Sequence, residues 1–261
     1  MAGEFAGRIV VVTGGSRGIG RGIALAFARA GAQIVLASSS EQNLAAAAKA
    51  IAAEGPEPVT VAGDLRSLDA CERLFGVVND RFRRCDVLIN NAGATRAGAF
   101  LELPDAAWLD GFALKFFGCV RLTRLFWPLL KAAQGSVVNI VGGAARSPEA
   151  EFLIGGSVNA AVANFSKGLS KLGNRDNVNV NVIHPGNTDT ERQQQLREQR
   201  AAALGKTVEE LRAEALTKSG MRRFGQPDDI AALALFLCSE RARHIQGSAI
   251  AVDGGATPGV H

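Results

Sequence analysis

Short runs of β-branched and other apolar residues alternate with longer stretches rich in alanine and leucine along most of the chain. The first run, "RIVVVTGG", precedes "GIGRGIALAFARAG", and the second, "QIVLASSS", precedes "EQNLAAAAKAIAAEG". Further apolar runs are "PVTVAGD", "DVLINNAG", "GSVVNIVGG", "NVNVNVIHPG" and "SAIAVDGG". Strands this apolar, separated by helices, indicate a parallel sheet covered on both faces. The pattern therefore predicts a doubly wound α/β fold.

Three other segments bear on where a functional site can lie. A long helix is predicted from about Pro104 to Ala133, and another contains the stretch "EFLIGGSVNAAVANFSKGL" at residues 151–169. Residues 187–219 depart from the alternation of strand and helix. Within them, "TVEE" places Thr207 as an N-cap with Glu210 three residues later, a capping-box pattern for a short helix. We expect residues 187–219 to form a helical lid over a pocket.

The composition is that of one globular domain. With 261 residues, 47% of them hydrophobic, the chain can bury a large core, and we predict a single domain over residues 1–261. The formal charge of +4 is spread over separate basic clusters, which argues against nucleic acid but leaves anionic small molecules as ligands. No apolar run approaches the length that crosses a bilayer, so we expect no membrane association.

The cysteines and the first residues of the chain bear on its location. The four cysteines show neither CxxC nor metal-ligand spacing, so we expect no metal site. The opening "MAGEFAGRIVVVTGG" lacks the charged region and apolar core of a signal peptide. These features favour the reducing cytoplasm.

The strongest chemical motif is "VVVTGGSRGIGRGIALAF". Gly14, Gly18 and Gly20 follow a TGxxxGxG spacing, with a strand before them and a helix after them. Such a turn lets backbone N–H groups approach a pyrophosphate, with the positive end of the helix dipole behind them. The motif predicts a dinucleotide site.

With this motif, the chain resembles the short-chain dehydrogenase/reductase family across nearly its whole length. The other matching pieces are "AGD" at 62–64, "NNAG" at 90–93, "HPG" at 184–186, "RRFGQPDDIA" at 222–231 and "AVDGG" at 251–255. The resemblance implies a Rossmann-like fold, oxidoreductase activity on a small molecule, and a homodimer or homotetramer built through the long helices and the C-terminal segment.

The resemblance also implies which residues bind the cofactor. Asp64 and Leu65 would flank the adenine, and the turn from Asn90 to Gly93 would support the cofactor cleft, although a capped turn without ligand contact is an alternative for Asn90 and Asn91. The full set of expected cofactor residues is Gly14, Ser16, Arg17, Gly18, Ile19, Gly20, Ser38, Ser39, Asp64, Leu65, Asn91, Ala92, Gly93, Asn159, Pro185 and Gly186.

The end of the second strand favours NADP(H) over NAD(H). Sites that prefer NAD usually place an acid there to bind the ribose hydroxyls. Ser38 stands at this position, so a 2′-phosphate would not be repelled, and Arg17 with Ser38, Ser39 and Ser40 could bind it. In the alternative interpretation, Arg17 is a surface cation and the serines only cap the next helix.

Four catalytic positions implied by the resemblance are all changed in this sequence. The family places a serine at the end of the fifth strand, a tyrosine and a lysine spaced YxxxK on the next helix, and an asparagine on the preceding long helix. The residues at these positions are Gly142, Gly155, Asn159 and Lys115, and the chain contains no tyrosine. Glycine cannot supply the proton that the tyrosine donates. The Gly142 N–H is a candidate oxyanion donor, and Asn159 a candidate ligand of the nicotinamide ribose.

Lys115 is the candidate for the missing chemistry. It shares a helical stripe with Trp108, Phe112, Cys119 and Leu122, where a charge is costly unless it is used. In one interpretation its ammonium lies in the emptied cleft and stabilises an anionic oxygen or, with a pKa lowered by burial, donates a proton. In the other, its stem packs inside and the ammonium reaches solvent.

Weaker candidates receive no catalytic role. His184 is interpreted as structural, "RQQQLREQR" as a solvated helix face, and the loop around Arg146 as a charged surface loop. Three functions stay open: an NADP(H)-dependent oxidoreductase acting on a carbonyl, enone or alcohol, a non-redox lyase or isomerase on the same fold, and a cofactor-binding sensor or partner subunit without catalysis.

Overall fold

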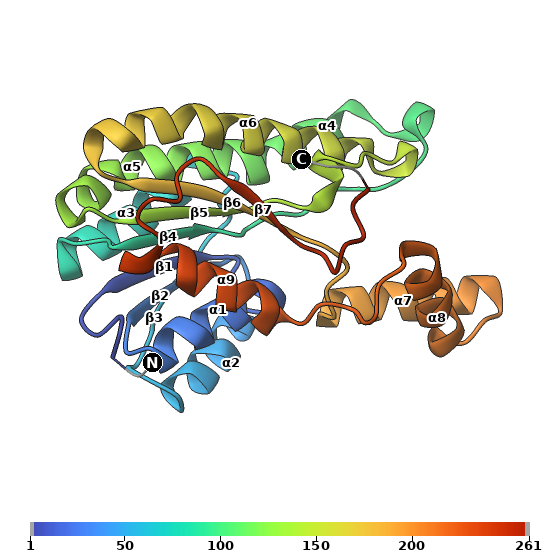
Figure 1. The fold of residues 1–261 in the computed structure, drawn as a ribbon, viewed down its shortest axis with the longest axis horizontal. Coiled ribbons are helices and arrows are strands. Elements are labelled where there is room, and N and C mark those ends of the chain that lie inside the picture. Colours follow the sequence, from blue (N-terminus) through green and yellow to red (C-terminus); the bar gives the residue numbers. More distant parts are fainter. Residues whose placement is uncertain (1–2, 259–261) are drawn as a thin grey trace.

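Seven parallel strands form the centre of the molecule in the computed structural model, which describes residues 3–258 (Figure 1). Their order across the sheet is β3-β2-β1-β4-β5-β6-β7. The strands are β1 (Ile9–Thr13), β2 (Gln33–Ser38), β3 (Val59–Ala62), β4 (Val87–Asn90), β5 (Ser136–Ile140), β6 (Asn179–Pro185) and β7 (Ala249–Val252). The predicted doubly wound, Rossmann-like α/β fold is confirmed.

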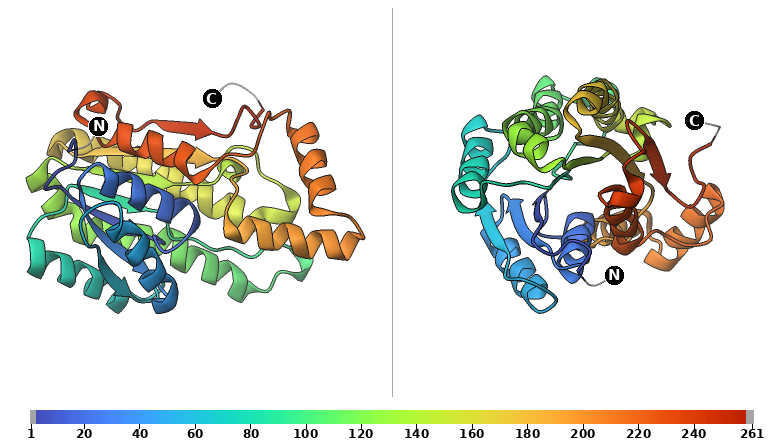
Figure 2. Two further views of the ribbon diagram at one scale, coloured as in Figure 1. Left: turned by 90° about the horizontal axis from the view of Figure 1, so that it is seen from below. Right: turned by 60° about the vertical axis from the view of Figure 1, so that its left-hand side comes forward.

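Helices cover both faces of the sheet because successive strand residues point to opposite faces. Val10 and Val12 of β1 pack in one buried cluster with α1 (Gly18–Arg29), α2 (Glu41–Ala52) and α9 (Pro227–Leu237). Val11 packs in the other, with α3 (Leu68–Phe82) and α5 (Gly118–Ala133). The same layer holds α4 (Asp105–Phe112) and α6 (Leu153–Asp176), as the two turned views show (Figure 2). Short 3₁₀ helices are Phe100–Glu102, Gly143–Ala145, Ala150–Phe152 and Glu240–Ala242.

The strand order fixes where a ligand can enter. β1 pairs with β2 on one side and β4 on the other, so the chain runs outward in opposite directions from the centre of the sheet. In such sheets the loops after β1 and β4 separate, and a crevice opens at the carboxyl ends of the strands. The glycine motif follows β1 directly, so the fold places it at this crevice.

The predicted long helix contains an irregular turn. The structure has α4, then a π-helical turn at Ala113–Phe117, then α5, all in one helical run. Lys115 lies at the middle of the π-helical turn. Single π-turns inside α-helices are rare and occur often at functional sites.

The segment 187–219 forms two helices, α7 (Glu191–Leu204) and α8 (Val208–Ser219), which project beyond the sheet at one end of the molecule (Figure 1). The predicted capping box is confirmed, because Glu210 N donates to Thr207 Oγ1 at 3.1 Å and Thr207 N donates to Glu210 Oε2 at 2.8 Å.

The four cysteines are buried free thiols. Within residues 3–258, no helix combines the length and the apolar character needed to cross a membrane. The cytoplasmic location stays a prediction.

Candidate functional site

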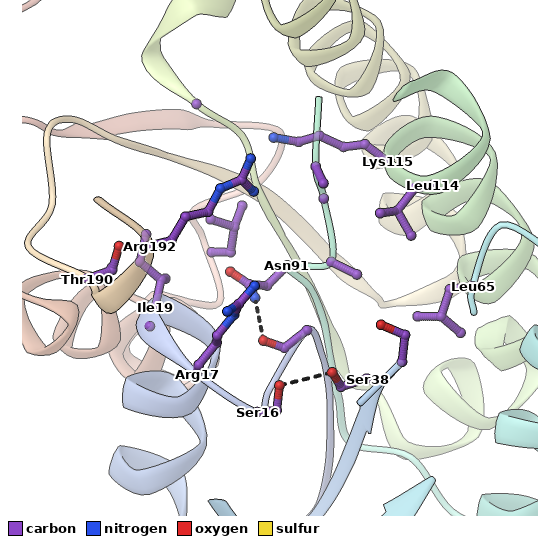
Figure 3. A pocket seen from close by; sticks show the side chains of 18 of the residues that line it. Ser16, Arg17, Ile19, Ser38, Leu65, Asn91, Leu114, Lys115, Thr190 and Arg192 are labelled. Atoms are coloured by element: carbon purple, nitrogen blue, oxygen red, sulfur yellow. Dashed lines mark hydrogen bonds between the residues drawn. The ribbon is translucent and has the colours of Figure 1, made fainter. Parts of the chain in front are cut away.

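A cleft of about 440 Å³ opens at the carboxyl ends of the central strands (Figure 3). One wall comes from the turn after β1, the opposite wall from the loops after β4 and β5, and α7 contributes its first residues. The lining residues include Gly14, Ser16, Arg17, Gly18, Ile19, Ser38, Ser39, Asp64, Leu65, Arg66, Asn91, Ala92, Gly93, Leu114, Lys115, Gly142, Pro185, Gly186, Thr190, Glu191, Arg192 and Gln193.

The glycine turn after β1 is shaped to hold an anion. Gly18 has φ +54°, and a Cβ on Gly20 would overlap the carbonyl oxygen of Gly14, so the tight turn requires glycine at both positions. The N-cap residue of α1, Arg17, forms no capping hydrogen bond with its own side chain. Instead, the Gly18 N–H donates to the Glu191 carboxylate at 3.2 Å. A negative group therefore already binds this helix end, as the helix dipole favours.

Asn91 and Thr13 join the ends of β4 and β1. The Asn91 Nδ2 group donates to the carbonyl oxygens of Thr13 and Gly14, each at 3.1 Å. The Asn91 and Ala92 N–H groups both donate to Thr13 Oγ1 at 3.0 Å. The Asn91 side chain thus holds the glycine turn in place. Asn90 is buried behind the cleft, where its Nδ2 donates to Asn139 Oδ1 at 2.8 Å.

No acid stands at the end of β2. The Ser38 and Ser16 hydroxyls lie 2.9 Å apart, and Ser39 is exposed beside them. Ser40 does not line the cleft; it caps α2 by accepting from Asn43 N at 3.3 Å. Asp64 does line the cleft, but its carboxylate is paired with Arg66 at 3.1 Å.

Gly142 and Asn159 fit against each other behind the loop after β5. The Gly142 N–H donates to Asn159 Oδ1 at 3.3 Å, and a Cβ on Gly142 would stand 2.9 Å from Asn159 Nδ2. Asn159 is 2% exposed and does not line the cleft. The Gly142 N–H is therefore already engaged, and the Asn159 amide fills the space that a larger residue at position 142 would need.

A phenylalanine fills the space next to Gly155. A Cβ on Gly155, in the first turn of α6, would overlap the ring of Phe152 one turn earlier. Gly155 is itself buried. The ring of Phe152 thus occupies the space into which a side chain at position 155 would extend.

Lys115 reaches into the cleft from the π-helical turn. Its stem packs on Gly93, where a Cβ would stand 3.0 Å from the Lys115 Cδ. The pKa of Lys115 is lowered to about 8, mainly by burial, with an opposing effect of Cys119 and a further lowering contribution from the charge of Arg192. Within residues 3–258 its ammonium forms no hydrogen bond or ion pair. The ammonium is thus a charged group without a protein partner at the wall of the cleft.

Comparisons with known proteins identify the family. A family model described as enoyl-(acyl carrier protein) reductase matches residues 14–257. L-fucose dehydrogenase of Bos taurus is 34% identical over 99% of this chain and 93% of that protein. The chain belongs to the short-chain dehydrogenase/reductase family. L-sorbose reductase of Gluconobacter frateurii, complexed with NADPH and L-sorbose, is 31% identical with a TM-score of 0.95 over 100% of both chains. A short chain dehydrogenase of Burkholderia cenocepacia in complex with NADP is 27% identical with a TM-score of 0.86 over 98% of this chain and 100% of that one.

In this short-chain dehydrogenase/reductase, the structure brings most of the predicted site residues to one cleft. The predicted cofactor residues that do not line it are Gly20, which shapes the turn from behind, and Asn159. The roles predicted for Gly142 and Asn159 stay predictions: the Gly142 N–H donates to Asn159 Oδ1, and the Asn159 amide is buried and does not line the cleft. His184 is also buried, its Nδ1 donates to the Val141 carbonyl at 2.9 Å, and burial lowers its pKa, which agrees with a structural role.

Sequence reasoning missed the part of the cleft that α7 supplies. Thr190, Glu191, Arg192 and Gln193 line the cleft, yet Arg192 belongs to the stretch interpreted as a solvated helix face. Residues 192–196 are all exposed, as that interpretation expects, but residues 192 and 193 also line the cleft. The N-cap at Thr190 is the sequence signal for this part of the cleft. Thr190 starts α7 beside the glycine turn of the short-chain dehydrogenase/reductase fold.

Proposed function

We propose that the protein is an NADPH-dependent oxidoreductase that reduces the carbonyl group of a small molecule, with Lys115 as proton donor in place of a tyrosine. Family membership supports nicotinamide-dependent redox chemistry on a small substrate. The observation that carries the proposal is the Lys115 ammonium, which lines the cleft without a protein partner and whose pKa is lowered to about 8. A group that titrates near the working pH is suited to donate a proton.

The residues of the cleft fit a dinucleotide. The Gly18 N–H that binds the Glu191 carboxylate offers the same contact to a pyrophosphate oxygen, with the end of α1 behind it. Ser38 and Ser39 stand at the end of β2, where no carboxylate repels a 2′-phosphate, and Arg17 of the turn after β1 lines the same cleft. The solved structures with NADPH or NADP that the chain resembles support the same preference.

Lys115 would act on the carbonyl oxygen. NADPH, when bound, supplies a hydride to the carbonyl carbon, and the π electrons of the C=O bond pass to the oxygen. The Lys115 Nζ donates one proton to this oxygen, which completes the alcohol, and the neutral amine regains a proton from water. The π-helical turn and the stem packed on Gly93 hold the ammonium at the cleft for this transfer.

We propose that the active site is remodelled at the positions where the family has its serine, tyrosine and lysine. Phe152 beside Gly155 and Asn159 beside Gly142 fill space that larger side chains at these glycines would need. This packing also favours the second candidate function, a cofactor-binding sensor or partner subunit without catalysis. Following NADPH absorbance with a panel of aldehydes, ketones and enones at saturating cofactor separates the two. Turnover supports the oxidoreductase, and NADPH binding without any turnover supports the sensor.

The cofactor preference can be reversed at one position. We expect Ser38→Asp to weaken NADPH binding by about tenfold or more, because a new carboxylate would repel the 2′-phosphate and remove a charge-assisted contact of about 1.5–3 kcal/mol. NADH binding should change little or improve. Fluorescence titration of both cofactors measures this, with Thr207→Asp, which keeps the cap of α8 far from β2, as the control. Equal NADPH affinity in both variants would contradict the assigned phosphate position.

Helices α7 and α8 are proposed as the lid of the cleft. Asp189 holds them together, because its carboxylate accepts from Arg197 and, at 2.8 and 2.9 Å, from Arg212. Both guanidinium groups also lie over the Phe224 ring. The bond from Arg212, followed by that from Arg197, lowers the pKa of Asp189 to about 2, so its stabilising effect persists above pH 4 and is lost as the pH falls toward 2.

Neutralising Asp189 should loosen the lid. We expect Asp189→Asn to speed tryptic cleavage within α7 and α8 by about tenfold or more, because removing one charged partner costs about 1.5–3 kcal/mol. The unfolding of the sheet core should change little. Mass spectrometry of timed digests locates the cuts, and Asp228→Asn, an exposed acid of the nearby α9, is the control. Equal cleavage rates in the two variants would show that Asp189 does not hold the lid.

Assembly into a homodimer or homotetramer stays a prediction. Two exposed apolar side chains support it. Leu109 of α4 is 66% exposed and Phe117 of the π-helical turn is 47% exposed. Both lie on the helical run expected to pack against a second copy, and burying them would remove apolar surface from water.

A further inference from the structure

Two cationic side chains face the same part of the cleft from opposite walls. Lys115 extends from the π-helical turn and Arg192 from the first turn of α7, and their charged ends point toward one another (Figure 3). Both line the cleft, and their charges are close enough for Arg192 to lower the pKa of Lys115. Two like charges placed this way repel each other unless an anion lies between them.

Among residues 3–258, no acidic side chain is paired with either of these two cations. Among the cleft-lining residues, the acids are Asp64 and Glu191. Asp64 is paired with Arg66, and Glu191 binds the Gly18 N–H and Arg21 on the α1 side. Within the described part of the chain, neither Lys115 nor Arg192 forms a hydrogen bond or an ion pair.

The first turn of α7 holds Arg192 in this direction. Thr190 caps the helix by accepting from Gln193 N at 3.3 Å, and Glu191 attaches the turn to α1 through Arg21, a contact that leaves the Gly18 N–H available to a pyrophosphate. Other arginines of α7 differ: Arg197 is bound to Asp189, and Arg200 is exposed and does not line the cleft. Arg192 is therefore the arginine of α7 that is placed to meet a ligand.

We propose that Arg192 is a specificity-determining residue that binds the carboxylate of an oxo-acid substrate, whose carbonyl oxygen then faces Lys115. The assignment of the carbonyl rests on the proposed function. The anion belongs to the substrate and not to the cofactor, because Arg192 points toward Lys115 and away from Ser16 of the glycine turn, where a pyrophosphate would bind. A guanidinium binds a carboxylate through two parallel hydrogen bonds, which gives geometric selectivity as well as affinity.

Calorimetry on the NADP⁺-saturated protein tests this without turnover. The probes are pyruvate and phenylglyoxylate, each compared with its neutral methyl ester. We expect at least one of the two anions to bind the wild-type protein about tenfold or more tightly than its ester. Arg192→Gln should abolish this difference and leave the NADP⁺ affinity within about twofold. The matched control is Arg200→Gln, which removes the same charge from the same helix outside the cleft and should behave like the wild type.

Each other result overturns the proposal. Equal affinity for anion and ester, or binding of neither, shows that the cleft does not select a carboxylate. A loss of NADP⁺ affinity in Arg192→Gln with an unchanged anion preference assigns the arginine to the cofactor. If the wild-type protein binds no dinucleotide, the proposed function fails separately. The comparison of anions with esters is then made on the cofactor-free protein. An anion preference that depends on Arg192 supports the role proposed for this residue, and the absence of such a preference overturns it.

Discussion

Lys115→Met is expected to lower the rate of NADPH-dependent carbonyl reduction by about 10²–10⁴-fold, the usual contribution of positioned proton transfer. Methionine keeps most of the apolar stem that packs on Gly93 but carries no proton to donate. NADPH affinity should therefore change little. The measurement is the single-turnover rate at saturating NADPH with the best substrate of the carbonyl panel, compared with Lys171→Met, which removes an exposed lysine of α6.

The pH dependence supplies an independent check on Lys115. Because the ammonium is the acid, the reduction rate should fall as the pH rises through about 8, the value to which burial lowers its pKa. The folded protein also binds this proton less tightly than the unfolded chain, so the free energy of unfolding should rise between about pH 8 and the ordinary value of 10.5. Unchanged turnover in Lys115→Met would rule out the lysine as proton donor and favour a cofactor-binding protein.

Gly155→Tyr is expected to lower the free energy of unfolding by about 1–3 kcal/mol, the usual cost of overpacking. The reason is the Phe152 ring, which a side chain at position 155 would overlap. The tyrosine should bring no gain in reduction rate, because its path toward the cleft is filled. Adding Phe152→Ala should recover most of the lost stability. Denaturant unfolding of the single and double variants measures both effects.

The control for Gly155→Tyr lies on the same helix. Gly168 of α6 is exposed, and apart from its own helix backbone no described residue packs within 4 Å of where its Cβ would stand, so Gly168→Tyr places the same side chain in open space. This variant should be as stable as the wild type or slightly more stable, because glycine is a poor helix former. If Gly155→Tyr were equally stable, Phe152 would have to swing out freely, and the space would not be closed.

The elements that the sequence predicted well are those specified by local pattern. The apolar runs of the strands, the glycines after β1 and the Thr207–Glu210 capping box each depend on residues within one short segment, and the structure has all of them. The sequence also placed Asp64, Asn91 and Gly186 at one cleft, because parallel strands end at the same edge of a sheet.

The features that the sequence did not predict depend on contacts between residues distant in the chain, or on local packing that leaves no pattern in the sequence. The Asn159 amide accepts from the Gly142 N–H, 17 residues away, and no local pattern in the sequence indicates this contact. Nothing in the apolar run 105–133 marks the π-helical turn that aims Lys115 into the cleft. Arg192 resembles any exposed helix charge in the sequence, and its direction depends on the ion pair between Glu191 and Arg21 of α1.

The packing of Gly142 against Asn159 restricts the order in which substitutions can be introduced at these two positions. A Cβ at position 142 meets Asn159 Nδ2 at 2.9 Å, so a serine introduced there alone encounters a contact that the asparagine creates. The same dependence links Gly155 to Phe152. Substitutions within each pair are therefore non-additive, as expected for residues in direct contact. Libraries that vary one residue at a time will miss the viable alternatives at this end of the cleft, whereas libraries that vary 142 with 159 and 152 with 155 will reach them.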